Sequence, residues 1–420
     1  MRRAGRGAGG PGRSTPSGSY RPASTVPGRA RGPRILIAPL NWGLGHAARC
    51  LPIAGALAGR GADVHWASDG AALALLRTER PDDIHHELPG YGVRHASASA
   101  IANGLRRLPG MLKGILGERV AVAALHRTHA YDLILSDHRY GCRVPGVPSV
   151  LLCHQVHLPL GSPLVAWAPD ALHRALVRRF DELAVPDWPP PRGLAGAMSR
   201  PLAGVPTRYL GPVSRFRKPP TANGDPAATT WASELACVLS GPEPARSGFE
   251  ALLLRQLADG EMSFLAAVRE RLRGFAVAHD VIVVRGRPRG GLDPNAALVA
   301  KAREAGVTVY DFLPSVPLRA VLANARALVT RPGYTSVMDL AALGRPAVFV
   351  PTPGQPEQAV LAGAIAVTGR GVAVAQEGFD LVEALDRLSE LPSDRRGGDA
   401  FGGDLLGSWA GDIAARFQRR

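Results

Sequence analysis

The stretch from Val329 to Gln358 constrains the fold of this 420-residue chain more than any other. A mostly apolar run leads into Arg331-Pro332-Gly333, an apolar-periodic segment follows as far as Gly344, and a short β-branched run comes next. This order predicts a strand, a glycine-containing turn, a helix and a second strand. A helix N-terminus placed after a strand and a glycine favours anion binding, because unpaired N–H groups and the helix dipole both point at the ligand.

The start of this predicted helix carries polar side chains. Thr335 or Ser336 would be the N-cap, since a hydroxyl there accepts a hydrogen bond from an unpaired backbone N–H group. Asp339 would then be the third or fourth helical residue, where its carboxylate could reach a sugar hydroxyl. Taken alone, the stretch is explained equally well by an ordinary strand–helix–strand unit with a solvated aspartate.

The same alternation of strands and helices recurs along most of the chain and predicts an α/β fold with two Rossmann-like domains. A Pro-, Thr-, Ala-, Asn- and Gly-rich segment between the two series predicts a linker. The expected organisation is a leader over residues 1–33, a first domain over 34–216, a linker over 217–231, a second domain over 232–395, and a loose segment with a C-terminal helix over 396–420.

The leader is basic and low in apolar residues. The first 34 residues hold eight of the chain's arginines and no acidic residue, so they carry eight of the formal net charge of +15. We expect this leader to be disordered and see in it no apolar core of a secretory signal. The rest of the chain is only mildly basic and 5% of all residues are aromatic, which disfavours nucleic-acid binding.

Membrane and redox signals are weak. No apolar run is long enough to span a bilayer, but residues 105–116 mix Lys/Arg with Leu, Ile and Met, as a peripheral membrane contact or a solvated helix face would. The four cysteines are far apart and form no metal-binding spacing, so we expect buried free thiols in a cytoplasmic protein. The 12 histidines form no metal-binding array, and His85-His86 is expected on a surface loop.

Three predicted strands of the first domain end in polar residues. His46 follows the first strand across a Gly43-x-Gly45 turn, Asp137 closes another strand together with Ser136, and His154 follows a third. Because open α/β sheets bind ligands at the carboxyl ends of their strands, we expect these side chains to converge. The turn lacks the third glycine of the dinucleotide fingerprint, so it gives little support to NAD binding. Residues 183–219 are expected to be irregular apart from a strand near Arg208.

With these features, the chain resembles the GT-B glycosyltransferases, in particular the group that includes the N-acetylglucosaminyltransferase of the lipid-linked peptidoglycan precursor, with a family 28-like C-terminal domain. The resemblance covers roughly residues 34–385, and its firmest parts are residues 41–49, 136–141, 240–246, 311–314 and 331–358. It implies two Rossmann-like domains, no cofactor, and a nucleoside-diphosphate sugar, expected to be UDP-linked, as donor.

The resemblance also implies roles for individual residues. His46 would be the general base, or the group that orients the acceptor hydroxyl, and Asp137 the other catalytic residue. The donor-binding residues would be Gly43, Gly45, Gly241, Arg246, Phe312, Leu313, Gly333, Thr335, Ser336, Asp339, Gln355 and Gln358, with Arg246 at the diphosphate and Asp339 at the ribose. The first loop has one glycine fewer than the peptidoglycan enzyme, and Asp339 stands where glutamate is usual.

The implied reaction is transfer of a hexose or N-acetylhexosamine to an acceptor hydroxyl. Helix N-termini and Arg246 would stabilise the departing diphosphate without a metal, since the chain has no D-x-D motif, and His46 would deprotonate the acceptor with inversion at the sugar. The acceptor stays open between a lipid-linked sugar, a glycolipid and a small metabolite, at the inner face of the membrane or in the cytoplasm. Two alternatives also stay open: a nucleotide-sugar 2-epimerase and a non-catalytic nucleotide-sugar-binding protein.

Overall fold

The computed structural model describes residues 32–91, 100–158, 163–216, 231–241, 243–259, 279–287, 292–392 and 404–418. Almost all of the predicted leader and linker, and the loose segment before the last helix, lie outside these ranges. The predictions made for those segments, and the domain boundaries drawn through them, therefore stay predictions.

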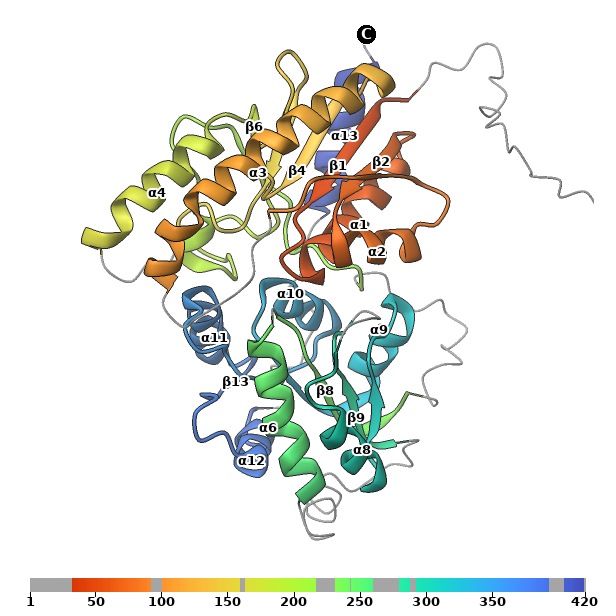
Figure 1. Ribbon diagram of the computed structural model, residues 1–420, viewed down its shortest axis with the longest axis vertical. Coiled ribbons are helices and arrows are strands. Elements are labelled where there is room, and N and C mark those ends of the chain that lie inside the picture. Colours follow the sequence, from red (N-terminus) through yellow and green to blue (C-terminus); the bar gives the residue numbers. More distant parts are fainter. Residues whose placement is uncertain are drawn as a thin grey trace, which may run out of the picture. The chain divides into compact units, whose positions relative to one another are not determined.

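Seven parallel strands form the first sheet, in the order β3-β2-β1-β4-β5-β6-β7 (Figure 1). These strands are β1 Arg34–Pro39, β2 Asp63–Ser68, β3 Ile84–Glu87, β4 Leu133–Asp137, β5 Ser149–Leu152, β6 Glu182–Val185 and β7 Thr207–Tyr209. The helices of this half are α1 Leu44–Ala58, α2 Gly70–Glu79, α3 Ala100–His129, α4 Pro163–Val177, the 3-10 turn η1 Gly196–Ser199 and, from the end of the chain, α13 Leu405–Gln418.

Strand β1 shows how the first sheet is covered on both faces. Ile35 and Ile37 pack in one core with α1, α2 and α13, whereas Leu36 and Ala38 pack in another with Val122 of α3. All four side chains are fully buried, as the continuous apolar run of a parallel strand requires. Helix α13 thus returns the end of the chain to the first sheet, where it packs on α1 and β7.

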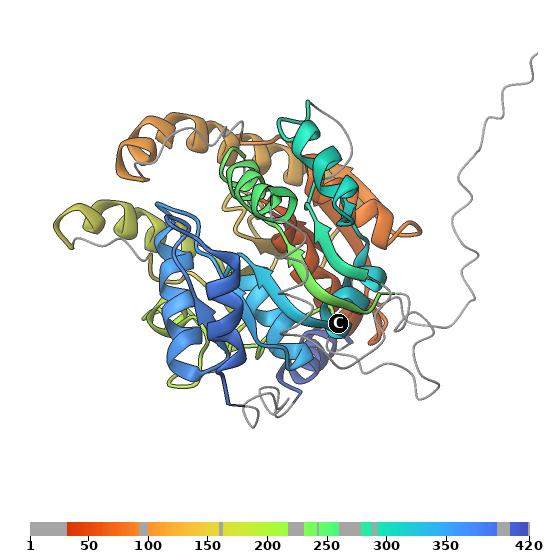
Figure 2. The ribbon, with the colours of Figure 1, turned by 90° about the horizontal axis from the view of Figure 1, so that it is seen from below.

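Six parallel strands form the second sheet, in the order β10-β9-β8-β11-β12-β13. Its strands are β8 Ser233–Val238, β9 His279–Val284, β10 Thr308–Tyr310, β11 Ala325–Thr330, β12 Ala347–Phe349 and β13 Gly371–Ala373. Its helices are α6 Ala245–Asp259, α8 Ala296–Glu304, α9 Ser315–Asn324, α10 Tyr334–Leu343, α11 Pro356–Thr368 and α12 Leu381–Ser389. Figure 2, a view turned by 90°, also shows helices on both sides of these strands.

The predicted α/β architecture with two Rossmann-like sheets is confirmed, and several local predictions are wrong. His85 and His86 lie in strand β3 rather than on a surface loop. The stretch expected to be irregular begins with strand β6, whose fully buried Leu183 and Ala184 match the apolar run of a central strand. All four cysteines are buried and free, as expected. Among the described residues, none of the helices combines the length and apolarity needed to cross a membrane.

Candidate active site

Helix α1 brings His46 to the carboxyl end of β1. The helix begins after Gly43, whose φ of 102° and ψ of 165° suit glycine far better than any other residue. His46 is the third residue of the helix, and Arg49 lies one turn later on the same side. Both side chains therefore point at the end of the neighbouring strand β4, which closes at Asp137.

Asp137 is the centre of the polar cluster at this edge. Its side chain is fully buried and receives Arg49 Nε at 2.7 Å, His46 Nδ1 lies at 3.1 Å, and His138 Nδ1 lies at 2.9 Å. Arg49 also donates to the second carboxylate oxygen, so the pair is bidentate. Burial by itself raises the pKa of Asp137, but the charge of Arg49 and the hydrogen bonds from the two imidazoles outweigh it and hold that pKa well below its usual range.

His46 keeps a path to solvent while its neighbour His138 does not act as a charged group. The His46 side chain is 17% exposed, whereas burial, reinforced by the charge of Arg49, lowers the pKa of His138 to about 3 despite its bond to Asp137. A guanidinium only donates, so the 2.9 Å contact between Arg49 Nη2 and His46 Nδ1 competes with donation from His46 Nδ1 to Asp137. When His46 donates its Nδ1 proton in a hydrogen bond to Asp137, the lone pair of Nε2 is left to accept another proton.

The second sheet contributes directly to the same cluster. His154, which follows β5, receives Arg49 Nη1 at 2.9 Å on Nδ1, and its Nε2 lies 2.7 Å from Glu357 Oε1 at the start of α11. Its ring stacks on Tyr334, the first residue of α10, with centroids 3.9 Å apart and planes 17° from parallel. Burial lowers the pKa of His154, and the pKa of Glu357 is also lowered because attraction to His154 exceeds the effect of burial.

The N-terminus of α10 lies against that of α1. Thr335 Oγ1 donates to the carbonyl of Gly45 at 3.0 Å. A Cβ added to Gly45 would lie 2.9 Å from Thr335 Oγ1. The N-cap is Gly333, with no side-chain cap bond, so the predicted cap at Thr335 or Ser336 is wrong. The hydroxyl of Thr335 is used across the contact instead of within the helix. The unpaired N–H groups at this end of α10 are left without a side-chain acceptor.

Asp339 lies deeper than predicted. It is the sixth residue of α10 rather than the third or fourth, because the helix starts at Tyr334. It is buried, accepts from Ser214 Oγ at 2.6 Å, and lies 3.7 Å from Arg215 Nε. Burial raises its pKa to about 6, an effect that Arg215 and the Ser214 hydroxyl only partly offset. A ribose contact through this carboxylate stays a prediction.

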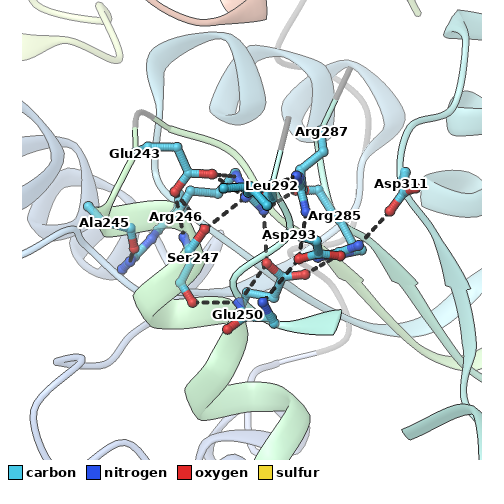
Figure 3. Close-up of polar contacts among 12 residues, drawn as sticks. Glu243, Ala245, Arg246, Ser247, Glu250, Arg285, Arg287, Leu292, Asp293 and Asp311 are labelled. Atoms are coloured by element: carbon cyan, nitrogen blue, oxygen red, sulfur yellow. Dashed lines mark hydrogen bonds and ion pairs between the residues drawn. The ribbon is translucent and has the colours of Figure 1, made fainter. Parts of the chain in front are cut away.

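Arg246 is held in an ion-pair network inside its own half (Figure 3). Its guanidinium bonds Glu243, donates to Glu250 at 3.1 Å and to the carbonyl of Arg285 at 3.0 Å, and is 3% exposed. Arg285 in turn pairs with Glu250 and Asp311. The carboxylates around Arg246 neutralise it, so contact with a diphosphate would require Arg246 to leave partners it already has. That contact also stays a prediction.

The remaining predicted donor residues fall in three places. Gly241 follows β8 with a φ of +107°, and no atom would touch an added Cβ. Phe312 packs against the core of the first half, whereas Leu313 is buried in the core of the second. Gln358 and Gln355 bond each other at 2.7 Å at the start of α11, and Gln358 Oε1 also accepts from the backbone of Thr352.

Four residues of this cluster were not singled out from the sequence: Arg49, His138, Tyr334 and Glu357. Arg49 carried a usable signal, because it lies three residues after His46 in a predicted helix. His138 follows Asp137 directly, but this does not indicate which way its side chain points. Its φ of 57° is an exception for a non-glycine residue. Tyr334 and Glu357 reach the cluster from the other sheet, which local patterns do not reveal.

Among the described residues of this cluster, one group of side chains could serve as metal ligands. His46, Asp137 and His138 each offer a ligand atom, and these lie within 4.8 Å of one another. Arg49 already donates to both oxygens of Asp137, so a fixed positive charge stands beside any cation placed there. The chemistry of this group suits an imidazole–carboxylate pair better than a cation site.

Comparisons with known proteins bear on the family and the fold. Residues 290–395 match the glycosyltransferase family 28 C-terminal domain. A UDP-N-acetylglucosamine–N-acetylmuramyl-(pentapeptide) pyrophosphoryl-undecaprenol N-acetylglucosamine transferase from Methylorubrum extorquens (strain PA1) is 34% identical over 97 residues, which cover 20% of this chain and 26% of that protein. The transferase of that name from Rhodospirillum rubrum is 26% identical over 385 residues, or 86% of each chain.

Solved structures extend the likeness to the whole fold. The calicheamicin glycosyltransferase CalG4 has a TM-score of 0.57 at 17% identity, covering 93% of this chain and 99% of that one. The chain therefore has the GT-B fold and resembles the N-acetylglucosamine transferases named above, as predicted. At the level of the family 28 domain, the predicted enzyme class, a glycosyltransferase, is also confirmed. The segment matched in the first of these relatives is only about a quarter of its length.

Proposed function

We propose that this protein transfers a hexose or N-acetylhexosamine from a UDP-sugar to an acceptor hydroxyl, with His46 as general base. The observation that carries the proposal is the pair formed by His46 and the buried, ionised Asp137. A base for a sugar hydroxyl must be reachable, titrate near neutral pH and be oriented by a second group. His46 is partly exposed and is oriented through Nδ1.

In this mechanism Asp137 accepts a hydrogen bond from His46 Nδ1–H, and Nε2 takes the proton of the acceptor hydroxyl. The hydroxyl oxygen then attacks the anomeric carbon, the bond to the diphosphate breaks, and the imidazolium is stabilised by Asp137. Arg49 keeps Asp137 ionised through its hydrogen bonds to both carboxylate oxygens. A single displacement of this kind inverts the anomeric carbon.

The departing diphosphate would be received at the N-terminus of α10. Gly333 caps this helix without a side-chain acceptor, and its free N–H groups and dipole favour an anion. Because backbone donors can offset the developing charge, the proposed reaction needs no metal. Asp339, Gln355 and Gln358 would bind the ribose and the sugar, as the resemblance implies.

The proposal names the acceptor only by class: a lipid-linked sugar, a glycolipid or a small metabolite, met in the cytoplasm or at the inner face of the membrane. Exposed apolar side chains on α3 support a membrane contact. Leu112, Leu116 and Val120 are 48%, 62% and 71% exposed and lie four residues apart, next to exposed Lys113 and Arg119. Co-sedimentation with anionic vesicles tests this, and Leu116→Asp with no loss of vesicle binding would contradict it.

The function is tested by nucleotide release and sugar analysis. Wild-type protein is incubated with UDP-hexoses and UDP-N-acetylhexosamines, with and without a panel of the three acceptor classes. We expect UDP release and a glycosylated product only with an acceptor, and a drop of about 10²–10⁴-fold in His46→Ala with UDP binding unchanged. His85→Ala, a histidine on β3 outside the cluster, is the matched control.

The alternatives give different outcomes in the same experiment. Epimerised or free sugar formed without any acceptor would identify a 2-epimerase. UDP-sugar binding with no turnover in any mixture, and no difference between wild type and His46→Ala, would favour a non-catalytic binding protein.

A further inference from the structure

Three histidines meet at the amino-terminal side of the first sheet, away from the candidate active site. His65 is the third residue of β2, His86 lies on the neighbouring strand β3, and His129 is the last residue of α3. His86 is in register with Ala67, two residues beyond His65, so both imidazoles leave the same face of the sheet. Helix α3 covers that face, through Val122 among others, and delivers His129 to it.

The three rings are close enough to share a ligand. Their centroids are 5.7 Å apart for His65 and His86, 5.2 Å for His65 and His129, and 4.8 Å for His86 and His129. One ring nitrogen from each lies within 4.8 Å of one from each of the others. Zinc–nitrogen bonds of about 2.0–2.1 Å in a tetrahedral site place such atoms about 3.4 Å apart, so closure needs shifts of about 1 Å. His86 and His129 are only half-buried and have room to make them.

A buried nitrogen without a partner is the second observation. His65 is 1% exposed, and its Nε2 has no hydrogen bond. The nearest carboxylate oxygen, Asp63 Oδ1, lies 3.5 Å away. An unsatisfied buried polar atom costs about 1–3 kcal/mol unless something binds it, and His65 is one of the three histidines that could share an ion.

All three imidazoles are in the form that binds metals. Burial lowers the pKa of His65, of His129, and of His86 to about 4, with repulsion among the rings and from Arg34 adding to the effect. They are therefore neutral at physiological pH, and a metal need not displace protons from them. Arg34 is a like charge for a cation, but its Nε is paired with Asp63 Oδ2 at 2.9 Å.

Tyr131 supplies the outer part of the site. Its hydroxyl lies 3.0 Å from His65 Nδ1 and 3.0 Å from His86 Nε2. A phenol oxygen can accept from both N–H groups, which leaves the lone pair of the other nitrogen on each ring to bind a metal. It thereby fixes the orientation of both rings, which is what metal-binding histidines require of their neighbours.

We propose that His65, His86 and His129 form a binding site for a divalent transition-metal ion, with zinc as the best match. Three neutral imidazoles suit zinc, copper or nickel, and the fourth position falls to a water or to Asp63. The ion would link β2, β3 and the end of α3 at the edge opposite the carboxyl ends of the strands. Its effect would be to stabilise the first half, since an ion that binds only the folded chain shifts unfolding by mass action.

Zinc binding to the full chain, purified without a histidine tag and freed of metal, tests the proposal. We expect His86→Ala and His129→Ala each to bind one zinc ion fewer per chain than wild type, measured by elemental analysis after gel filtration. The thermal stabilisation that zinc gives wild type should be lost in both. His85→Ala, on the opposite face of β3, and His46→Ala, in the other group of possible ligands, should bind as wild type does.

Cobalt(II) gives a readout that needs no variant. Wild type loaded with cobalt should show the intense visible absorption of a tetrahedral ion with nitrogen ligands, and zinc should displace it. Near-equal zinc content in wild type, His86→Ala and His129→Ala would overturn the proposal, and so would a wild-type chain that retains no zinc. Either result would leave His65 and His86 as hydrogen-bond partners of Tyr131, with the ring of His129 packed beside them.

Discussion

Two buried aspartates, Asp137 in the first half and Asp339 in the second, have pKa values shifted in opposite directions although both are removed from solvent. Asp137 receives Arg49 Nε at 2.7 Å and two imidazoles, and its pKa stays well below the usual range. Asp339 has one hydroxyl at 2.6 Å and a guanidinium at 3.7 Å, and burial raises its pKa to about 6. Direct hydrogen bonds from a charged donor therefore decide whether the pKa of a buried carboxylate is lowered or raised.

The largest expected effect is on catalysis and comes from Asp137→Asn. The amide no longer stabilises the imidazolium of His46, so we expect the rate of transfer to fall by about 10²–10⁴-fold. It also leaves Arg49 buried without its carboxylate, at a cost of about 3–5 kcal/mol in unfolding free energy. Asp339→Asn is the matched control, and we expect it to change donor KM by less than about tenfold, because the amide can still accept from Ser214. Equal losses in the two variants would remove the distinction between these aspartates.

The second prediction concerns stability and pH. A carboxyl whose folded pKa is raised binds its proton more tightly when folded, so stability falls as pH rises from about 4 to about 6. Ionised Asp339 then costs up to about 3 kcal/mol at pH 7, from a shift of about two pKa units. We expect Asp339→Asn to raise the melting temperature above wild type at pH 8, to keep about half of that gain at about pH 5 and to lose most of it by about pH 4. A pH-independent difference would contradict this assignment.

Asp137 should show the opposite dependence. Its depressed pKa means that the unfolded chain takes up a proton first, so its contribution to stability is present above about pH 4 and is lost as pH falls.

A smaller effect is expected at Glu357, which contacts the Asp137 cluster from the second half. Glu357→Gln keeps a hydrogen bond to His154 Nε2 but removes the charge. Charged hydrogen bonds contribute about 1 kcal/mol more than neutral ones, so the unfolding free energy should fall by about that amount. Chemical denaturation measures it, with Glu377→Gln on the exposed surface as control. No difference between the two would mean that the contact between the halves is not formed in solution.

The smallest effect should come from the hydrogen bond between the two helix N-termini. Thr335→Val removes the 3.0 Å bond to the carbonyl of Gly45 while keeping the side-chain shape. We expect a loss of about 1 kcal/mol in unfolding free energy, against almost none for Ser336→Ala. A larger loss in Ser336→Ala would reverse the assignment of these two hydroxyls.

Much of the fold followed from the sequence because apolar runs and glycines mark parallel strands and their turns. The runs at residues 34–39 and 325–330 became central strands, and their carboxyl ends lie where polar residues gather. Strand β3 was missed because Ile84–Glu87 is polar and lies at the sheet edge, where burial does not impose an apolar pattern. The cluster of His65, His86 and His129 was not predicted either, because its members come from three elements that are separate in the sequence.

The candidate site was predictable only in part. His46 and Asp137 each end a recognisable strand or begin a helix, so the rule that ligands meet at carboxyl ends brought them together. The partner of Asp339 could not be foreseen, because Ser214 lies 125 residues away in the chain, whereas the carboxylates around Arg246, those of Glu243 and Glu250, lie three and four residues from it. Local sequence patterns indicate where a residue lies along a helix or strand, but not which charged side chain from another element faces that residue.

A double-mutant comparison tests the central claim most directly. If His46 and Asp137 act as one catalytic unit, removing the second after the first has little left to disrupt. Transfer rates are measured for His46→Ala, Asp137→Asn and the double variant with the donor and acceptor that wild type uses. We expect the double variant to be within about threefold of His46→Ala alone. A double variant slower by the product of the two single losses would show that the residues act independently and would contradict it.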